Sequence, residues 1–340
     1  MVKIRSLIVF FIKLVCASVV SILLLSGFVL LYSNTGVHID NKDGSTDYKW
    51  LPDQFKTTMT EGFAVIKTDG NGFNNVLGDV RNINVLLMGS SHMEAFNIPQ
   101  DKNTAAVLNT LIDPLYCYNI GISGHSLYTC MKNVQRALEV WQPSDYVVIV
   151  SDTAEPSEDD MRSVLNGTYE KIPSYDQGLL FAVQKYVPGI KVIYKDIEDW
   201  YKADEKEENG DSDPLAEAFD VIDTCNDEKD VLSAFLGLLK NAADQAGVTP
   251  ILVFQPPTEI DSNGQFICKD EFSRTVLAQA CESAGIVFVD MTQAFQRLYE
   301  ERHILAHGFA NTAVGVGHLN AEGHRLIAEK LAEVILGHVS

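Results

Sequence analysis

The chain has 340 residues, which is enough for one large domain or two small ones. Its formal net charge is −20 and its sequence pI is near 4.7. Because nucleic-acid binding needs clustered cations, so acidic a chain argues against a nucleic-acid partner. Its six cysteines do not form the pattern of a small disulfide scaffold.

Residues 14–32 form an uncharged and almost wholly apolar stretch of 19 residues, close to the roughly 20 that a helix needs to cross a bilayer. Lys3, Arg5 and Lys13 all precede this stretch, which predicts a cytoplasmic N-terminus and an extracytoplasmic main domain. A cleaved signal peptide is the alternative, but no convincing small-x-small cleavage site follows Gly27. We therefore expect residues 1–35 to be a single-pass anchor in the cell membrane.

The rest of the chain carries 23 basic and 46 acidic residues, a net charge of −23. Residues 36–83 are polar and rich in Gly, Asn and Asp, so we predict a tether and an irregular lead-in there. Residues 84–340 alternate strand and helix patterns and form the predicted main domain. An acidic insertion at about residues 153–228 interrupts the alternation, and we expect it to be a solvated surface segment.

Five cysteines follow the predicted anchor, in a space that can be oxidising, and an odd number leaves at least one unpaired. Cys117 and Cys281 lie in apolar runs and are predicted to be buried small hydrophobes. Cys225 and Cys268 lie in irregular segments and are the candidates for a bridge.

Short apolar runs predict buried strands at residues 84–88, 115–120, 146–150, 250–254 and 286–289. Helical patterns are found at residues 104–112, 127–141, 230–246, 271–284 and 321–335, the last with Asn320 as its cap. A weaker strand pattern lies within the insertion, at residues 190–194. Apolar strands that alternate with helices indicate an α/β fold, with a parallel sheet covered on both faces. Sites in such sheets form at the carboxyl ends of the strands.

The first predicted strand ends in the run Gly89-Ser90-Ser91-His92-Met93-Glu94. A serine at a strand-to-helix turn is exposed at the sheet edge and can share the helix N-terminus with a developing oxyanion. Ser91 is therefore a candidate nucleophile. The alternative is that Ser91 and Glu94 form a capping box, which requires no catalysis.

Two further segments could complete a site. The second strand leads into Gly121 and Gly124. Glycines at these positions let backbone N–H groups approach a ligand closely, as an oxyanion hole requires. The alternative is a plain tight turn. His318 lies on a loop just before the closing helix, where a histidine is accessible, and its ordinary pKa near 6.5 suits a general base.

These pieces, in this order, resemble the sequence blocks of the SGNH (GDSL-like) hydrolase family over roughly residues 84–337. The run around Ser91 is similar to the first block, and the resemblance implies that Ser91 is the nucleophile. The run from Asn119 to Gly124 is similar to the second block, which implies that the Gly121 N–H joins the Ser91 N–H in the oxyanion hole.

The last block of the family is also recognisable. The run from His318 to His324 looks like the block around the family's catalytic histidine, and the run from Asp69 to Phe73 resembles the lead-in of many members. The implied fold is a flavodoxin-like three-layer sandwich with a five-stranded parallel sheet, preceded by a transmembrane helix.

Two positions depart from the family pattern. The third block normally supplies an asparagine to the oxyanion hole, but the third strand here leads into Asp152; the Thr153 hydroxyl could donate instead. The family's last block carries an aspartate three residues before the histidine, and that position is Gly315. The candidates to orient the His318 ring are then Asn311, Asp290, Asp152 or a backbone carbonyl.

His92 and His125 follow the candidate nucleophile and the glycine turn, so both could line the pocket, although surface or capping roles are favoured for each. We see no histidines and cysteines at zinc-ligand spacing, and we expect no metal and no cofactor.

The resemblance implies a serine esterase or O-acyltransferase that uses a Ser91 acyl-enzyme on acyl esters, acetyl above all, of a surface glycan or an acylated small substrate. Members anchored in this way often partner membrane-bound O-acyltransferases. The alternative is a catalytically inactive SGNH-like module for glycan binding or assembly at the membrane, which the two departures favour.

Overall fold

In the computed structural model of the protein, residues 2–32, 36–59, 61–76, 82–156, 160 and 227–337 are described. The predicted strand at residues 190–194, most of the acidic insertion and Cys225 lie outside these residues. The possible bridge between Cys225 and Cys268 therefore stays a prediction. Cys117 and Cys281 are buried, as predicted.

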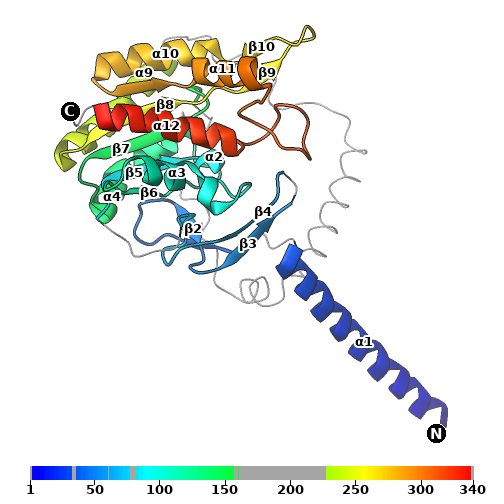
Figure 1. Cartoon of the computed structure of the whole chain (residues 1–340). Helices are drawn as coiled ribbons and strands as arrows, with labels where there is room; N and C mark the ends of the chain where they lie inside the picture. The colour runs from blue at the N-terminus through cyan, green and yellow to red at the C-terminus, as the bar shows by residue number, and fades with distance from the viewer. Residues whose placement is uncertain are drawn as a thin grey trace.

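A five-stranded parallel sheet forms the centre of the main domain. Its strands are β5 (Val85–Gly89), β6 (Cys117–Asn119), β7 (Tyr146–Ser151), β8 (Thr249–Phe254) and β11 (Val287–Asp290). Their order is β11-β8-β7-β5-β6, and every neighbouring pair is parallel. Numbered along the chain, this is the 2-1-3-4-5 order of flavodoxin-like folds, with its switch point between β5 and β7. The predicted fold class is confirmed (Figure 1).

Helices cover both faces of this sheet. One face packs against α4 (Leu127–Trp141), α9 (Asp227–Ala246) and α10 (Glu271–Ala284). The other packs against α3 (Thr104–Leu111), α11 (Thr292–Arg302) and α12 (Ala321–Gly337). Consecutive residues of β5 point to opposite faces, so Leu86 belongs to the first core and Leu87 to the second. Because both faces are covered, all of β5 is buried, which explains its continuous apolar run.

The predicted strands and helices match these elements closely, but the sequence pattern missed α11 and the short elements. α11 carries six charged or amide side chains in its eleven residues, and its buried apolar residues are Phe295 and Leu298. So narrow an apolar stripe gives a weak periodic signal. The short elements are α2 (Ser91–Glu94), η1 (Gln100–Lys102) and a hairpin of β9 (Thr258–Ile260) with β10 (Phe266–Cys268).

The prediction of a tether at residues 36–83 was wrong for the residues that the structure describes. Two antiparallel hairpins form there, β1 (His38–Asp40) with β2 (Tyr48–Trp50) and β3 (Phe55–Thr58) with β4 (Ala64–Lys67). Trp50, Ile66 and Phe73 belong to the buried core of the main domain. Strands of three or four residues with few apolar side chains leave almost no periodic signal, so the segment was misread as irregular.

Asp69 fixes this lead-in to the sheet. Its carboxylate accepts hydrogen bonds from the backbone N–H groups of Asn71 (2.9 Å) and Phe73 (3.0 Å). It also accepts from the Tyr118 hydroxyl (2.7 Å) and from Asn75 Nδ2 (3.0 Å). Tyr118 belongs to β6, so one buried carboxylate joins the lead-in loop to the edge strand.

We predict that Asp69→Ala lowers the unfolding free energy by about 2–4 kcal/mol, because it leaves buried donors without an acceptor. Asp101→Ala is the matched control: the Asp101 carboxylate is mostly exposed and pairs with Lys102, so its loss should cost less than about 1 kcal/mol. Denaturant unfolding of the full chain in detergent measures both. Equal losses for the two variants would contradict this role of Asp69.

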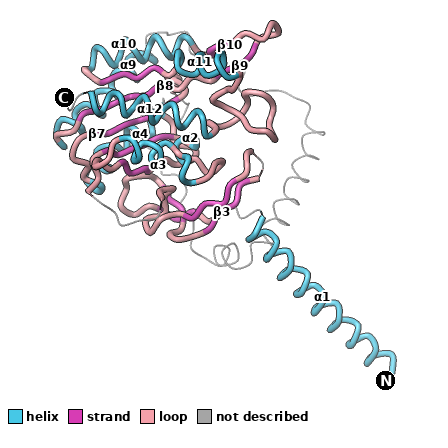
Figure 2. The backbone as a smooth tube through the Cα atoms, in the orientation of Figure 1, coloured by secondary structure: helices cyan, strands magenta, loops and turns pink. Residues whose placement is uncertain are grey.

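The N-terminal helix α1 (Val2–Tyr32) extends away from the sandwich (Figure 2). Its segment Ser6–Phe28 is long and apolar enough to cross a membrane, and its central part is not buried against the rest of the protein. A signal sequence would have the same character. Among the strands, α1 contacts β3.

Candidate active site

Ser91 is placed at the first position of α2 by the end of β5. The N-cap of α2 is Ser90, whose carbonyl accepts from the N–H groups of Met93 and Glu94, both at 3.0 Å. The Glu94 carboxylate turns inward and accepts from Trp50 Nε1 (2.6 Å) and from the Ser123 hydroxyl. Ser91 and Glu94 therefore form no capping box, and the Ser91 hydroxyl is available for another partner.

That partner is His318. Ser91 Oγ lies 2.8 Å from His318 Nε2. The His318 loop is held in place by its own backbone, because the Gly308 N–H donates to the His318 carbonyl (3.0 Å). Asn320 caps α12 immediately afterwards, accepting from the N–H groups of Glu322 and Gly323 as predicted. The expected approach of Ser91 and His318 is thus present in the structure.

Glu61 is the third residue in the series of contacts that starts at Ser91 and continues through His318. The sequence analysis did not identify it. The Glu61 carboxylate is hydrogen-bonded to His318 Nδ1, and its other oxygen accepts from the His318 backbone N–H (2.7 Å). A carboxylate at Nδ1 selects the tautomer in which Nδ1 carries the proton. His318 Nε2 is then left as the acceptor for the Ser91 hydroxyl proton.

Glu61 lies in the connection between β3 and β4, and two asparagines hold that connection against the domain. Asn97 Nδ2 donates to the Glu61 carbonyl (3.0 Å) and to its carboxylate (3.2 Å). Asn311 accepts from the Gly62 N–H (2.8 Å) and donates to the Met59 carbonyl (2.8 Å). The carboxylate thus approaches His318 from a fixed backbone.

The candidates that we predicted to orient His318 occupy other places. Asn311 binds the loop that carries Glu61 rather than the imidazole. Asp290 accepts from Arg274 Nε (2.6 Å) and from the Thr292 N–H (2.9 Å) at the end of β11. Asp152 faces His92 instead, with 3.8 Å between its Oδ2 and His92 Nε2. Because Glu61 already occupies the Nδ1 side of His318, these three predictions were wrong.

The glycine turn after β6 also differs from the prediction. The Gly121 N–H donates to Asn119 Oδ1 (2.8 Å), so it is not available to an oxyanion. A Cβ atom on Gly121 would lie 2.7 Å from Met93 Cβ and 2.8 Å from Glu94 N. The glycine is therefore required for the close packing of α2 on this turn.

The Thr153 hydroxyl accepts from the Glu155 N–H (3.0 Å) and lies 3.3 Å from Ser273 Oγ. It is engaged in its own turn and with α10, so the structure gives no sign that it donates toward Ser91. The predicted third oxyanion donor is thus not supported by the contacts of Thr153.

His92 borders the site, whereas His125 does not. The rings of His92 and His318 have centroids 5.0 Å apart. The Leu319 N–H donates to His92 Nδ1 (3.2 Å), which leaves the His92 proton on Nε2, toward Asp152. His125 is buried elsewhere, with its Nε2 3.7 Å from Asp47 Oδ2, and burial lowers its pKa to about 4.

Two more buried histidines surround this centre. His307 is hydrogen-bonded to Gln255 Oε1 (2.7 Å), and His324 Nδ1 to Thr104 Oγ1 (2.8 Å). Burial, followed by neighbouring imidazoles, lowers the pKa of His307 to about 4 and that of His324 to about 3. Burial likewise holds the pKa of His92 well below 6.5. These three rings are therefore neutral at pH 7.

Asp152 is the acidic group on this side of the site. The register pairs Gly89 of β5 with Val150 of β7, so Ser91 and Asp152 follow equivalent positions of adjacent strands. Burial raises the pKa of the Asp152 carboxyl, and the nearby Asp270 adds to the effect. A carboxylate stands where the family has a neutral amide donor.

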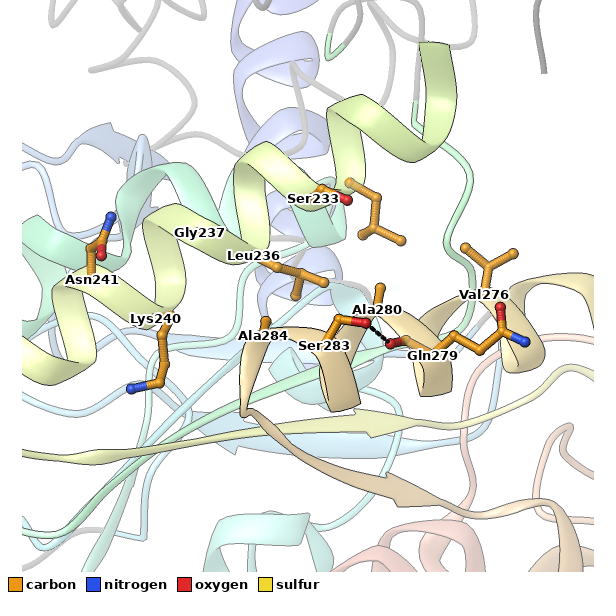
Figure 3. A pocket seen from close by; sticks show the side chains of 11 residues that line it. Ser233, Leu236, Gly237, Lys240, Asn241, Val276, Gln279, Ala280, Ser283 and Ala284 are labelled. Atoms are coloured by element: carbon orange, nitrogen blue, oxygen red, sulfur yellow. Dashed lines mark hydrogen bonds between the residues drawn. The ribbon is translucent and has the colours of Figure 1, made fainter. Parts of the chain in front are cut away.

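In the described part of the chain, no group of three or more His, Cys, Asp or Glu side chains is arranged to hold a metal ion. A groove of about 460 Å³ between α9 and α10 contains serines but no histidine (Figure 3). Its Ser283 hydroxyl donates to the Gln279 carbonyl of its own helix (2.8 Å), so the groove offers no activated nucleophile.

No family model matches the chain, and no curated protein does. Among solved structures, it is similar to a candidate SGNH hydrolase from Slackia heliotrinireducens, at 16% identity and a TM-score of 0.37, covering 74% of this chain and 98% of that one.

Two esterases are similar at the same level. An acetyl xylan esterase, AlAXEase, is 12% identical with a TM-score of 0.42, over 74% of this chain and 98% of that one. The psychrotrophic esterase EstA from a Pseudoalteromonas species is 13% identical with a TM-score of 0.40, over 75% and 98%. At these identities the function of this chain has to be argued from its own site.

The carboxylate contact can be tested through Gly317. A Cβ atom on Gly317 would overlap Glu61 Oε1. If the site is an esterase site, we predict that Gly317→Ala displaces Glu61 and lowers kcat/KM toward an aryl acetate by about a hundredfold or more.

Gly264→Ala is the matched control, because Gly264 also has a positive φ (+80°) but an added Cβ there meets nothing within 4 Å. Its kcat/KM should stay within about twofold of the wild type, since backbone strain alone leaves the site intact. An equal loss of activity in both variants would mean that strain, not contact with Glu61, matters at Gly317.

The buried histidines predict a pH dependence of stability. Their folded-state pKa values lie below the unfolded value near 6.5, so the unfolded chain binds more protons as the pH falls below 6.5. The unfolding free energy should then drop between pH 7 and pH 5, by roughly 1–2 kcal/mol each for His307 and His324.

Denaturant unfolding of the full chain at the two pH values measures this drop. His324→Gln should reduce it by about 1–2 kcal/mol, whereas His303→Gln, at an exposed helix end, should leave it unchanged. If the unfolding free energy drops equally in the wild type and in both variants, His324 is excluded as a source of the pH dependence.

Proposed function

We propose that the protein is a serine esterase or O-acyltransferase of the SGNH type, with a catalytic triad of Ser91, His318 and Glu61. The observation that carries this proposal is the unbroken chain of contacts from Ser91 Oγ through both ring nitrogens of His318 to the Glu61 carboxylate. The site lies at the carboxyl ends of the strands, at the switch point between β5 and β7, where open α/β sheets bind ligands.

Each group has a defined step. His318 Nε2 takes the proton of Ser91 Oγ as the oxygen attacks the acyl carbonyl and forms the Oγ–C bond. The resulting imidazolium is stabilised by Glu61 and returns the proton to the departing alcohol as its C–O bond breaks. Water or a sugar hydroxyl then attacks the acyl-enzyme, His318 takes its proton, and the proton returns to Ser91 Oγ as the product acid or ester leaves.

The oxyanion donors we propose are backbone groups. The Ser91 N–H is at the first position of α2, where a helix provides no internal acceptor. The Ile122 N–H donates to the Gly89 carbonyl (3.0 Å), so the turn that contains Gly124 runs beside the turn that leads to Ser91. Gly124, in the same turn, has a φ of +83°, and its N–H is the second donor we propose.

For the substrate and location, the proposal follows the motifs and the N-terminal helix. The helix anchors the chain, with the three basic residues before it on the cytoplasmic side and the main domain outside the cytoplasm. The substrate class is an acyl ester, acetyl above all, of a surface glycan, and a membrane-bound O-acyltransferase is the candidate partner. The chemistry of the triad requires no cofactor.

An inactive glycan-binding module is the second candidate, and Asp152 is the observation that favours it. A carboxylate beside the Ser91 turn would oppose a developing oxyanion wherever it stays ionised. The lack of an aspartate three residues before His318, at Gly315, no longer favours it, because Glu61 supplies a carboxylate at a nitrogen of the His318 ring.

Labelling of the full chain with a serine-directed fluorophosphonate separates the two candidates. We expect the wild type to be labelled and Ser91→Ala to be unlabelled, because the activated hydroxyl is the only group the proposal makes reactive. Absence of labelling in the wild type, or equal labelling of Ser91→Ala, would rule out the triad as an active catalyst.

The role of Glu61 has its own test. Glu61→Gln should lower kcat/KM for an aryl acetate by about a hundredfold to ten-thousandfold, because an amide cannot stabilise the imidazolium. Asp290→Asn is the control and should stay within about twofold of the wild type, since Asp290 binds Arg274 and not His318. Similar activity of Glu61→Gln and the wild type would remove Glu61 from the mechanism.

A further inference from the structure

Apolar side chains stand exposed beside the Ser91–His318–Glu61 site. On β4, Ala64 and Ile66 are buried and Val65 is 51% exposed, and Phe63, which directly precedes this strand, is 63% exposed. Met59, at the other end of the connection that carries Glu61, is 46% exposed. Exposed apolar residues are unremarkable singly, but here they occupy one hairpin.

The loop that leads to His318 adds two more. Val314 is 77% exposed and Val316 is 60% exposed. This loop and the hairpin are joined by Asn311, which binds the Met59 carbonyl and the Gly62 N–H. Both segments are therefore part of one surface at the edge of the site, which we call the catalytic rim: Met59, Phe63, Val65, Val314 and Val316.

The rim adjoins the N-terminal helix. α1 contacts β3, and β3 pairs with β4 so that Thr57 lies opposite Val65. The apolar span of α1 ends at Phe28, and Ser26, in its last turns, is buried against the protein. The hairpin that carries Glu61 thus lies where an apolar helix meets the folded domain (Figure 1).

We propose that the catalytic rim docks on the surface of the bilayer that holds α1, so that the site receives ester substrates presented at the membrane. This inference rests on the proposed membrane anchoring and acyl chemistry. Exposed apolar side chains next to a membrane-spanning helix can be buried in the headgroup region. This burial is favourable because the same side chains would otherwise contact water.

The charge of the domain limits how this docking works. The chain beyond residue 35 has a net charge of −23, so an anionic surface would repel it. On the hairpin itself, Lys67 pairs with Asp53, and Lys56 Nζ lies over the Trp50 and Phe96 rings, so basic groups there have protein partners. Docking is therefore driven by apolar burial, and zwitterionic lipid is the appropriate probe.

The full chain in phosphatidylcholine nanodiscs tests the inference. Tryptophan is introduced by Phe63→Trp or Val314→Trp, and the wild type corrects for Trp50, Trp141 and Trp200. Phe272→Trp on α10 is the matched control, because Phe272 is 50% exposed but lies outside the rim. Lipids with brominated acyl chains then quench the tryptophans that reach the bilayer.

We expect the added fluorescence of both rim variants to be quenched at least about twofold more than that of Phe272→Trp. Quenching of the rim variants no greater than that of the control would overturn the inference. Serine labelling of the wild type in the same nanodiscs keeps the two proposals distinguishable. A labelled but unquenched protein contradicts the docking alone, whereas a quenched but unlabelled one contradicts the acyl chemistry alone.

Discussion

The contact between Glu61 and His318 is the constraint on which the candidate site depends. It joins residues 257 positions apart, and it exists only because the β3–β4 hairpin is fixed to the sheet. That attachment uses buried groups of the lead-in, with Asp69 bonded to Tyr118 on β6 and Trp50 bonded to Glu94 on α2. The same segment therefore anchors the short nucleophile helix and delivers the carboxylate. Stability and chemistry share one set of hydrogen bonds.

The charge state of the histidines around His318 is determined more by burial than by neighbouring charges. Three neighbouring histidines are held neutral mainly by desolvation, so they add no positive charge that would oppose formation of the His318 imidazolium. Glu61 is the carboxylate in direct contact with the ring. Asp152 lies beside His92, with 3.8 Å between Asp152 Oδ2 and His92 Nε2. The arrangement therefore places a carboxylate on the His318 ring and keeps the three neighbouring rings neutral.

The sheet and the Ser91–His318 pair could be predicted from the sequence because their signals are local. Each strand is a short apolar run, and each residue of the pair stands at the boundary of such an element. Glu61 could not, because nothing in the residues around it specifies which distant loop it meets. One signal existed: Gly317 precedes His318 and leaves the space that the carboxylate fills. Gly121 was misassigned because a glycine required for packing and one that exposes an N–H look alike in sequence.

The position of Glu61 in the sequence also determines where the polypeptide can be cut without losing the proposed triad. The sheet begins at Val85, so a fragment cut just before that strand would retain all five strands, the nucleophile and its base. It would lack the carboxylate, together with the side chains that seat the nucleophile helix. Sequence blocks alone would place the boundary of the functional unit there. If the proposed triad is catalytic, the minimal functional unit starts earlier, within the segment that connects α1 to the sheet.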